Sequence, residues 1–190
     1  MKHAASRELY AYWEGRRGIR LAPERAEIEP GAIRSVLSDA FILGLDSAAG
    51  HPLRLAGTRV CALFCRELKG EPFMGLWGAE SQSVVASLLA ILADESVGTV
   101  AGVTAQNSMG DAINLELLLL PLGARRPSLA RAIGVLAPLK VPSWLGDSPI
   151  TMLALGARRH VGAAIEKRIL PRFMVSRTRR SFTVYEGGRP

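Results

Sequence analysis

The stretch from Pro52 to Trp77 constrains the fold most, because it combines signals for a strand, a turn and a helix. Leu53 and Leu55 alternate with other residues as in a short strand, and Gly57 then marks a turn. A glycine at position 70, followed closely by a proline, is the usual end of a helix. We therefore expect a helix between Gly57 and position 70, with its apolar face formed by Val60, Leu63, Phe64 and Leu68.

The segment before this stretch predicts short helices with apolar faces. Residues 7–17 have an aromatic face at helical spacing, and Gly18 is expected to end that helix. Pro23 and Pro30 each precede residues suited to a further helical turn. These faces must be buried either on a sheet or on a second copy of the chain.

The rest of the chain alternates between strand-like and helical patterns. Ala40–Asp46 and Leu53–Ala56 are expected to form a hairpin, and residues 80–95 have an apolar face typical of a long helix that ends near Gly98. Four strand-like segments follow: Val97–Gln106, Ile113–Leu120, Ala130–Ala137 and Ile150–Leu155.

Four phrases of the sequence resemble PAS domains. Residues 53–60 read LRLAGTRV, close to the PAS phrase F-R-x-A-G-T-x-hydrophobic, and Cys65–Gly70 resembles G-R-E-L-x-G. Glu8–Trp13 matches the E-L-Y-x-Y-W helix of the single-domain PAS proteins of alphaproteobacteria, and residues 182–188 resemble their closing phrase. The resemblance covers roughly Glu8 to Leu155.

The resemblance implies an α+β fold in which a five-stranded antiparallel sheet has helices on one face. The expected division is an N-terminal helical segment (1–39), a PAS-like domain (40–157) and a basic C-terminal extension (158–190). Members of this superfamily bind small ligands or cofactors, or form homodimers and pass signals to a separate partner protein. The chain is therefore expected to be a sensory or interaction module, and no activity transfers automatically.

The resemblance also places a ligand cavity between the sheet and the helices. The candidate pocket residues are Phe64, Phe73, Trp77, Val85 and Leu89. Aromatic clusters of this kind line pockets, but they also form ordinary core, so both interpretations stay open.

Cofactor and metal chemistry finds little support in the residue pattern. Cys61 and Cys65, expected at i and i+4 on one helix face, lack the two further ligands that zinc requires. Phe64 and Glu67 stand where the flavin-binding motif of light-oxygen-voltage PAS domains has Asn and Phe. Haem-binding PAS domains take an axial histidine from the long helix, and residues 80–95 contain none. We therefore expect no metal, flavin or haem. The two cysteines are expected to be buried as small apolar residues.

Catalysis is not expected either. The sequence contains no Gly-x-Ser-x-Gly elbow, HExxH motif, P-loop or GxGxxG motif. No signal peptide or apolar membrane span is apparent, and two cysteines without a disulfide framework suit the cytoplasm.

The net charge of +7 is concentrated at one end of the chain. Residues 158–190 hold nine Lys and Arg against two Glu, whereas the preceding residues are balanced. This segment, which includes an amphipathic stretch at 163–170, is compatible with binding to nucleic acid or an anionic membrane surface. It is also compatible with a solvated segment tied back to the domain by its apolar residues, which is the usual role of a run of charges.

Overall fold

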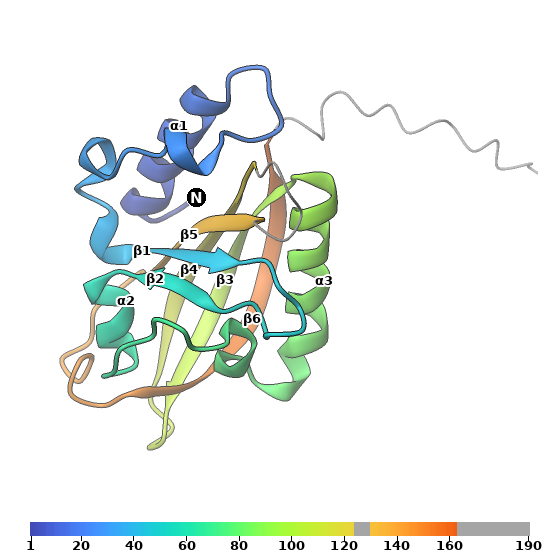
Figure 1. Cartoon of the computed structure of the whole chain (residues 1–190). Helices are drawn as coiled ribbons and strands as arrows, with labels where there is room; N and C mark the ends of the chain where they lie inside the picture. The colour runs from blue at the N-terminus through green and yellow to red at the C-terminus, as the bar shows by residue number, and fades with distance from the viewer. Residues whose placement is uncertain (124–129, 163–190) are drawn as a thin grey trace, which may run out of the picture.

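One six-stranded antiparallel sheet organises the part of the chain that the computed structural model describes, residues 1–123 and 130–162 (Figure 1). The strand order is β2-β1-β5-β4-β3-β6, and all neighbours are antiparallel. The antiparallel α+β fold predicted from the sequence is confirmed. The strands are β1 (Ala40–Gly44), β2 (Leu53–Ala56), β3 (Gly98–Asn107), β4 (Ala112–Leu122), β5 (Arg131–Pro138) and β6 (Ile150–Val161).

The predicted count of five strands is wrong, because β6 joins the sheet as a sixth strand beside β3. The strand-like pattern at Ile150–Leu155 is present, but the strand continues to Val161 and pairs with β3 down to Gly98. Arg158 and Arg159 therefore lie in the sheet. Pairing with β6 satisfies backbone groups of β3 that would otherwise form an open sheet edge.

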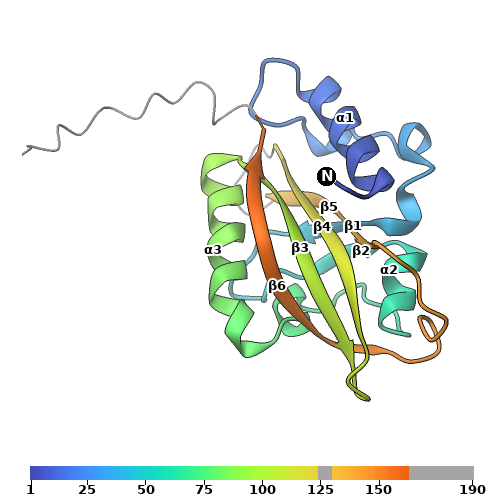
Figure 2. The ribbon, with the colours of Figure 1, turned by 180° about the vertical axis from the view of Figure 1, so that it is seen from behind.

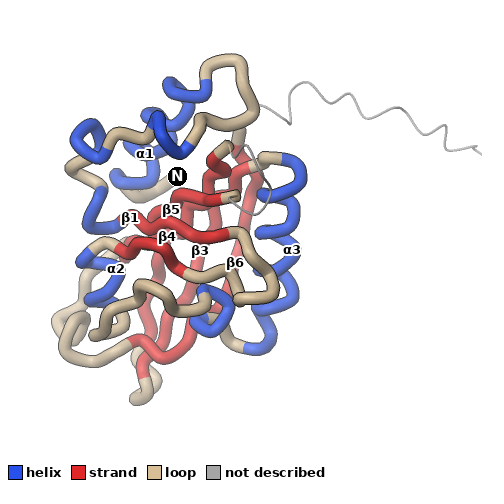
Figure 3. The backbone as a smooth tube through the Cα atoms, in the orientation of Figure 1, coloured by secondary structure: helices blue, strands red, loops and turns tan. Residues whose placement is uncertain are grey.

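Three helical segments pack on one face of the sheet, called here the inner face (Figure 3). Their apolar residues form one buried cluster with the odd-numbered residues of β3 and β4, such as Val103 and Leu117. The helices on this face match the prediction. The segments are α2 (Thr58–Leu63), the 3-10 turn η4 (Phe73–Leu76) and α3 (Ala79–Glu95).

The N-terminal helix α1 (Ala4–Arg17) packs on the opposite, outer face (Figure 2). Leu9 and Trp13 are fully buried there against β4 and β5, and the Trp13 indole N–H donates to the carbonyl of Pro121 at 2.8 Å. Of the two predicted burial places for this helix, the structure thus selects the sheet.

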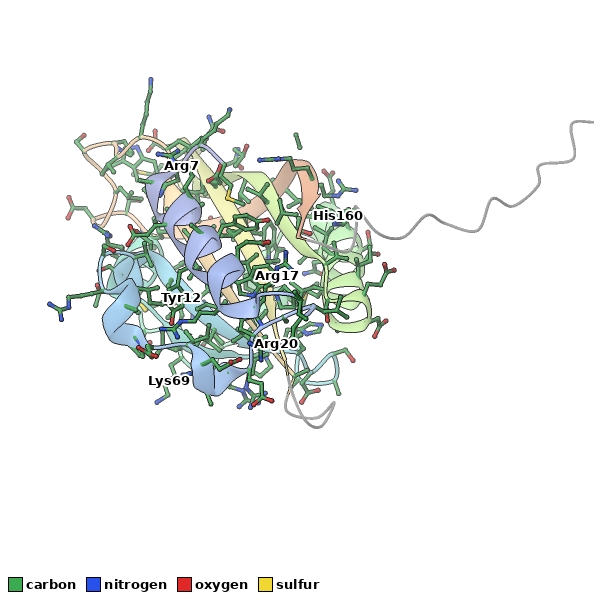
Figure 4. The ribbon with its side chains drawn as sticks, turned by 90° about the horizontal axis from the view of Figure 1, so that it is seen from above. Arg7, Tyr12, Arg17, Arg20, Lys69 and His160 are labelled. Atoms are coloured by element: carbon green, nitrogen blue, oxygen red, sulfur yellow. The ribbon has the colours of Figure 1, made fainter. Side chains whose placement is uncertain are left out.

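The end of α1 is held by a small network of arginines (Figure 4). Arg17 pairs with Glu14 and donates to the Arg20 carbonyl, while Arg20 donates back to the Arg17 carbonyl and pairs with Glu27. The helical turns predicted near Pro23 and Pro30 are the 3-10 turns η1 (Arg25–Glu27) and η2 (Pro30–Ile33). A third 3-10 turn, η3 (Leu37–Asp39), follows them.

Strand β4 contacts both buried clusters, because its side chains alternate between the two faces. Leu115, Leu117 and Leu119 face the inner cluster. Leu118 and Leu120 face α1 on the outer side. This strand is therefore the physical connection between the two faces.

Helix α2 is shorter than predicted. It ends at Leu63, and Cys65 already has a left-handed backbone with φ of 51°. The chain then turns before Leu68 is buried, so the expected helix up to Gly70 is wrong. The long helix predicted over residues 80–95 is confirmed, because α3 ends at Glu95 and Ser96 after it has the left-handed conformation.

The basic segment predicted to bind nucleic acid or lipid, including the amphipathic stretch at 163–170, lies outside the described residues from position 163 onward. Among the helices that the structure describes, none has the length and apolar character needed to span a bilayer.

Candidate functional site

All five candidate pocket residues lie in the inner cluster. Val85 and Leu89 come from α3, Phe73 and Trp77 from η4 and the residue after it, and Phe64 from the end of α2. Each is at most 4% exposed. The structure therefore brings together residues that are separated in sequence. We call this region, between the inner face and the segments α2, η4 and α3, the inner chamber.

Three aromatic rings form a continuous row in the inner chamber. Phe73 stacks on Phe41 of β1 with ring centroids 5.7 Å apart. Trp77 meets Phe73 edge to face at 5.6 Å. Such offset and edge-to-face pairs are favoured by the ring quadrupoles, so the row links β1 to the start of α3.

A cavity of about 370 Å³ opens at the surface beside the inner chamber, and we call it the mouth; of the five candidate pocket residues, Phe64 lines it. It lies between the end of α2, η4 and the first residues of β6. Phe64, Leu76 and Ile150 line the mouth and also belong to the buried cluster. Cys65, Arg66 and Thr151 form its polar rim. Drug-sized ligands occupy cavities of this order.

One polar atom in the inner chamber has no partner among the described residues: the indole nitrogen of Trp77. This contrasts with Trp13, whose indole is bonded to the Pro121 carbonyl. Buried N–H groups are nearly always hydrogen-bonded in native proteins, so this one needs an explanation. Sequence patterns did not reveal it, because a tryptophan in an apolar stretch looks the same with or without a partner.

His51 lies beside the same turn and also has a buried ring nitrogen, Nδ1, without a partner among the described residues. Burial lowers the pKa of His51, with Asp46 acting weakly in the opposite direction. The backbone of His51 accepts a hydrogen bond from Phe73 at 3.2 Å and holds η4 against the hairpin between β1 and β2. Its neutral imidazole is thus compatible with this partly buried position.

The two cysteines do not form a pair, which corrects their expected placement on one helix face. The Cys61 thiol is 3.6 Å from the Glu67 carboxylate, whereas the exposed Cys65 thiol points to the Gly146 carbonyl at 3.2 Å. Burial raises the pKa of Cys61, and Glu67 raises it further. A thiol in this state is protonated at neutral pH and is a poor nucleophile or metal ligand. Cys65 was expected to be buried, but it lies at the mouth because the helix ends before it.

Within the described residues, no three side chains of the His, Cys, Asp and Glu types come together as a metal site. The inner chamber is instead surrounded by aliphatic and aromatic side chains. This surface suits a small, mainly apolar molecule better than an ion.

Glu116 is a functional candidate that the sequence analysis missed. It is only 5% exposed on the outer side of β4, and its carboxylate accepts the backbone N–H groups of Lys2 at 2.5 Å and His3 at 3.0 Å. Burial acts to raise the pKa of Glu116, but these hydrogen bonds outweigh it and the pKa lies below its ordinary value. The signal available in the sequence was a single carboxylate inside an otherwise apolar strand.

Replacing Glu116 with glutamine is expected to lower the free energy of unfolding by about 1–3 kcal/mol at neutral pH, since a charged acceptor of two backbone N–H groups is lost. Because the folded-state pKa is depressed, the carboxylate stabilises the protein above its unfolded-state pKa of about 4.3 and loses this effect as the pH falls through the folded-state pKa. Urea unfolding at neutral and acidic pH measures the difference, which should shrink in acid.

The matched control for this prediction is Glu80→Gln, at an exposed carboxylate in the first turn of α3. It should change the unfolding free energy by no more than about 0.5 kcal/mol. Equal losses in the two variants, or a Glu116→Gln difference that persists in acid, would contradict the role assigned to Glu116.

Comparisons with solved structures return light-oxygen-voltage domains at low identity. A structure titled "Flavin Analogue Sheds Light on Light-Oxygen-Voltage Domain Mechanism" has 14% identity and a TM-score of 0.45, covering 62% of this chain and 87% of the other. The dark structure of the blue-light photoreceptor Aureochrome1 LOV gives 14% and 0.44, with 62% and 85% covered. An RNA-binding light-oxygen-voltage receptor gives 16% and 0.45, covering 66% of this chain and 36% of that one.

No curated protein matches the chain. The family comparison is decisive instead, because the model described as "PAS domain" matches residues 1–137. The match includes α1, β1 to β4, β5 up to Ala137, and every segment that surrounds the inner chamber except β6. Since it covers well over half of the sequence, this chain belongs to the PAS domain family.

Proposed function

We propose that this protein is a non-enzymatic, cytoplasmic sensory module that binds a small molecule in the inner chamber and passes the signal to another protein. The observation that carries the proposal is the mouth, a cavity of about 370 Å³ whose apolar wall is continuous with the buried cluster through Phe64, Leu76 and Ile150. Family membership supports the sensory role. An apolar wall without converging acid and base groups supports binding rather than catalysis.

Signal transfer in this proposal runs through β4 to α1. A ligand in the inner chamber would contact the cluster that contains Leu117 and Leu119, and the same strand carries Glu116 and Leu118 on the α1 side. A ligand changes a conformational equilibrium only as far as it binds one packing better than the other. The two arrangements would differ in how firmly α1 is held on the outer face.

In this proposal the signal is passed to the second copy of the chain in a homodimer and to a separate signalling protein. Two large apolar side chains next to the end of α1 support an interaction there, since Ile19 is fully exposed and Leu21 is 60% exposed. Figure 2 also shows that α1 leaves much of β3 and β6 uncovered on the outer face. Exposed neighbouring apolar residues are typical of interaction surfaces, although isolated ones are common.

Blocking the mouth is expected to abolish ligand binding without unfolding the protein. Thr151 is exposed on β6 at the rim, so Thr151→Trp would place a large ring across the entrance. Native mass spectrometry of protein purified under mild conditions should detect a co-purified small molecule in the wild type and at least tenfold less in the variant. The same spectra give the number of copies in the assembly.

The control for this experiment is Ala154→Trp, at another exposed position of β6 that does not line the mouth. It should retain the wild-type amount of bound molecule. If the wild type carries no small molecule, or if both variants lose it equally, the proposal that a ligand binds through the mouth is wrong.

A further inference from the structure

The Trp77 indole N–H is the one feature of the inner chamber that bears on the chemistry of a ligand. Trp77 is 3% exposed and its ring lies in the aromatic row, so water does not reach the nitrogen. No acceptor from the described residues bonds to it. Buried tryptophans usually find a partner for this group, as Trp13 does with the Pro121 carbonyl.

We propose that the ligand of the inner chamber is a neutral, mainly apolar molecule carrying a hydrogen-bond acceptor, such as a carbonyl oxygen, that bonds to the Trp77 indole N–H. This inference rests on the proposed function and adds the chemical class of the ligand. A site with an unpaired donor discriminates strongly in favour of molecules that supply the acceptor, because the alternative leaves the donor unsatisfied.

The surroundings of Trp77 explain why the ligand is neutral. The buried cluster around it is built from aliphatic and aromatic side chains. The polar side chains next to Trp77 are neutral, since Gln82 donates to the Trp77 carbonyl at 3.1 Å and Ser81 accepts from a backbone N–H of β6. An ionic group would therefore lose its hydration without gaining a counter-charge. The buried charged groups Arg17, Asp39 and Glu116 are already bonded elsewhere in the protein. At the rim, Arg66 is paired with Glu71 at 3.1 Å.

The position of Trp77 also explains how the ligand would be sensed. The backbone of Trp77 forms a bridge to Leu153 of β6, and the Gly78 N–H donates to the Leu153 carbonyl at 2.9 Å. In the next turn, Ser81 Oγ accepts the N–H of Leu155 at 2.9 Å. A molecule bonded to the Trp77 indole would therefore contact the residue next to the hydrogen bonds that join the start of α3 to β6.

Two matched probes test the proposal: acetophenone, which has a carbonyl acceptor, and ethylbenzene, which has a similar shape and none. The protein is labelled with ¹⁵N at its three tryptophans, and the indole N–H signals are followed during titration. Acetophenone is expected to move the Trp77 indole proton downfield, as a new hydrogen bond does. Ethylbenzene has no acceptor, so it should cause no downfield shift of the Trp77 indole proton. The Trp13 signal, already bonded to Pro121, serves as the internal reference.

Trp77→Phe removes the donor while keeping an aromatic ring. We expect the ratio of the two affinities, acetophenone over ethylbenzene, to fall about three- to tenfold in this variant. Because this ratio is compared between the variant and the wild type, the different hydrophobicity of the two probes cancels. Trp13→Phe and Trp144→Phe assign the remaining signals, so the wild-type titration stays decisive even if Trp77→Phe folds poorly.

The outcomes separate this inference from the proposed function. If both probes bind but the Trp77 proton shows no downfield shift with acetophenone, the acceptor requirement is wrong and the inner chamber remains a binding site. An upfield position of the Trp77 proton that neither probe changes would show that the N–H is satisfied by the face of the Phe73 ring, and would also overturn the inference. If neither probe perturbs any residue of the inner chamber, both the inference and the proposed function fail.

Discussion

Gly57→Ala is expected to lower the free energy of unfolding by about 3 kcal/mol or more, among the largest effects of a single methyl group in this protein. A Cβ atom at position 57 would lie 2.2 Å from the carbonyl oxygen of Leu37 and 2.4 Å from that of Ser38. Both atoms are backbone, so no side chain can rotate away to make room. Urea unfolding followed by circular dichroism measures the loss.

The contact around Gly57 has little freedom to open. The Gly57 N–H donates to the Ala40 carbonyl at 2.8 Å, and Arg59 of α2 pairs with the buried carboxylate of Asp39 at 2.8 Å. Moving α2 away from η3 to admit the methyl group would lengthen both bonds. The backbone angle itself is no obstacle, because φ of Gly57 is −69°.

The control for this substitution is Gly15→Ala, in the exposed part of α1 where nothing lies within 4 Å of the added methyl group. It should raise stability by about 0.5–1 kcal/mol, because alanine loses less conformational entropy than glycine in a helix. A Gly57→Ala protein as stable as the wild type would mean that η3 and α2 are not in close contact in solution.

Phe73→Ala is expected to cost about 3–5 kcal/mol of unfolding free energy. The side chain is 1% exposed and joins Phe41 and Trp77 in the aromatic row, so its removal leaves a cavity and ends both ring contacts. Chemical denaturation gives the loss, and Phe73→Leu should recover more than half of it by refilling the space.

Met74→Ala, at the neighbouring half-buried position in η4, is the matched control for Phe73→Ala. Its loss should be about 1 kcal/mol, because less apolar area is removed from the core. Comparable losses for the two variants would show that the aromatic row does not hold the inner chamber together.

The elements of this fold were largely predictable because each follows from local chemistry. The strand-like patterns of β1 to β5 and the apolar face of α3 come from side-chain periodicity. The end of α1 at Arg17, just before Gly18, follows from a backbone conformation that suits glycine, since Gly18 has φ of 56° and ψ of −123°. The inner-chamber residues were singled out for a different reason: they are apolar residues of segments expected to lie between the helices and the sheet.

Other features depend on contacts between distant segments and had no local signal. Helix α2 was expected to continue to Gly70, but its end at Leu63 lets Leu68 turn into the core. The extension of β6 past Leu155 depends on β3 offering free backbone groups. Gly57 was predicted to be a turn glycine, whereas the structure requires glycine because two backbone carbonyls lie against it.

Periodicity, helix ends and family phrases in the amino-acid order were thus enough for the antiparallel sheet, its helices and the membership of Phe73 and Trp77 in one apolar region. The three-dimensional arrangement alone established that Trp77 lacks an acceptor, that Glu116 holds the start of α1, and that β6 completes the sheet. The physical reason is the distance along the chain over which each kind of interaction acts. Backbone preferences act over a few neighbouring residues, whereas a hydrogen-bond partner or a close approach is set by segments that meet only after folding.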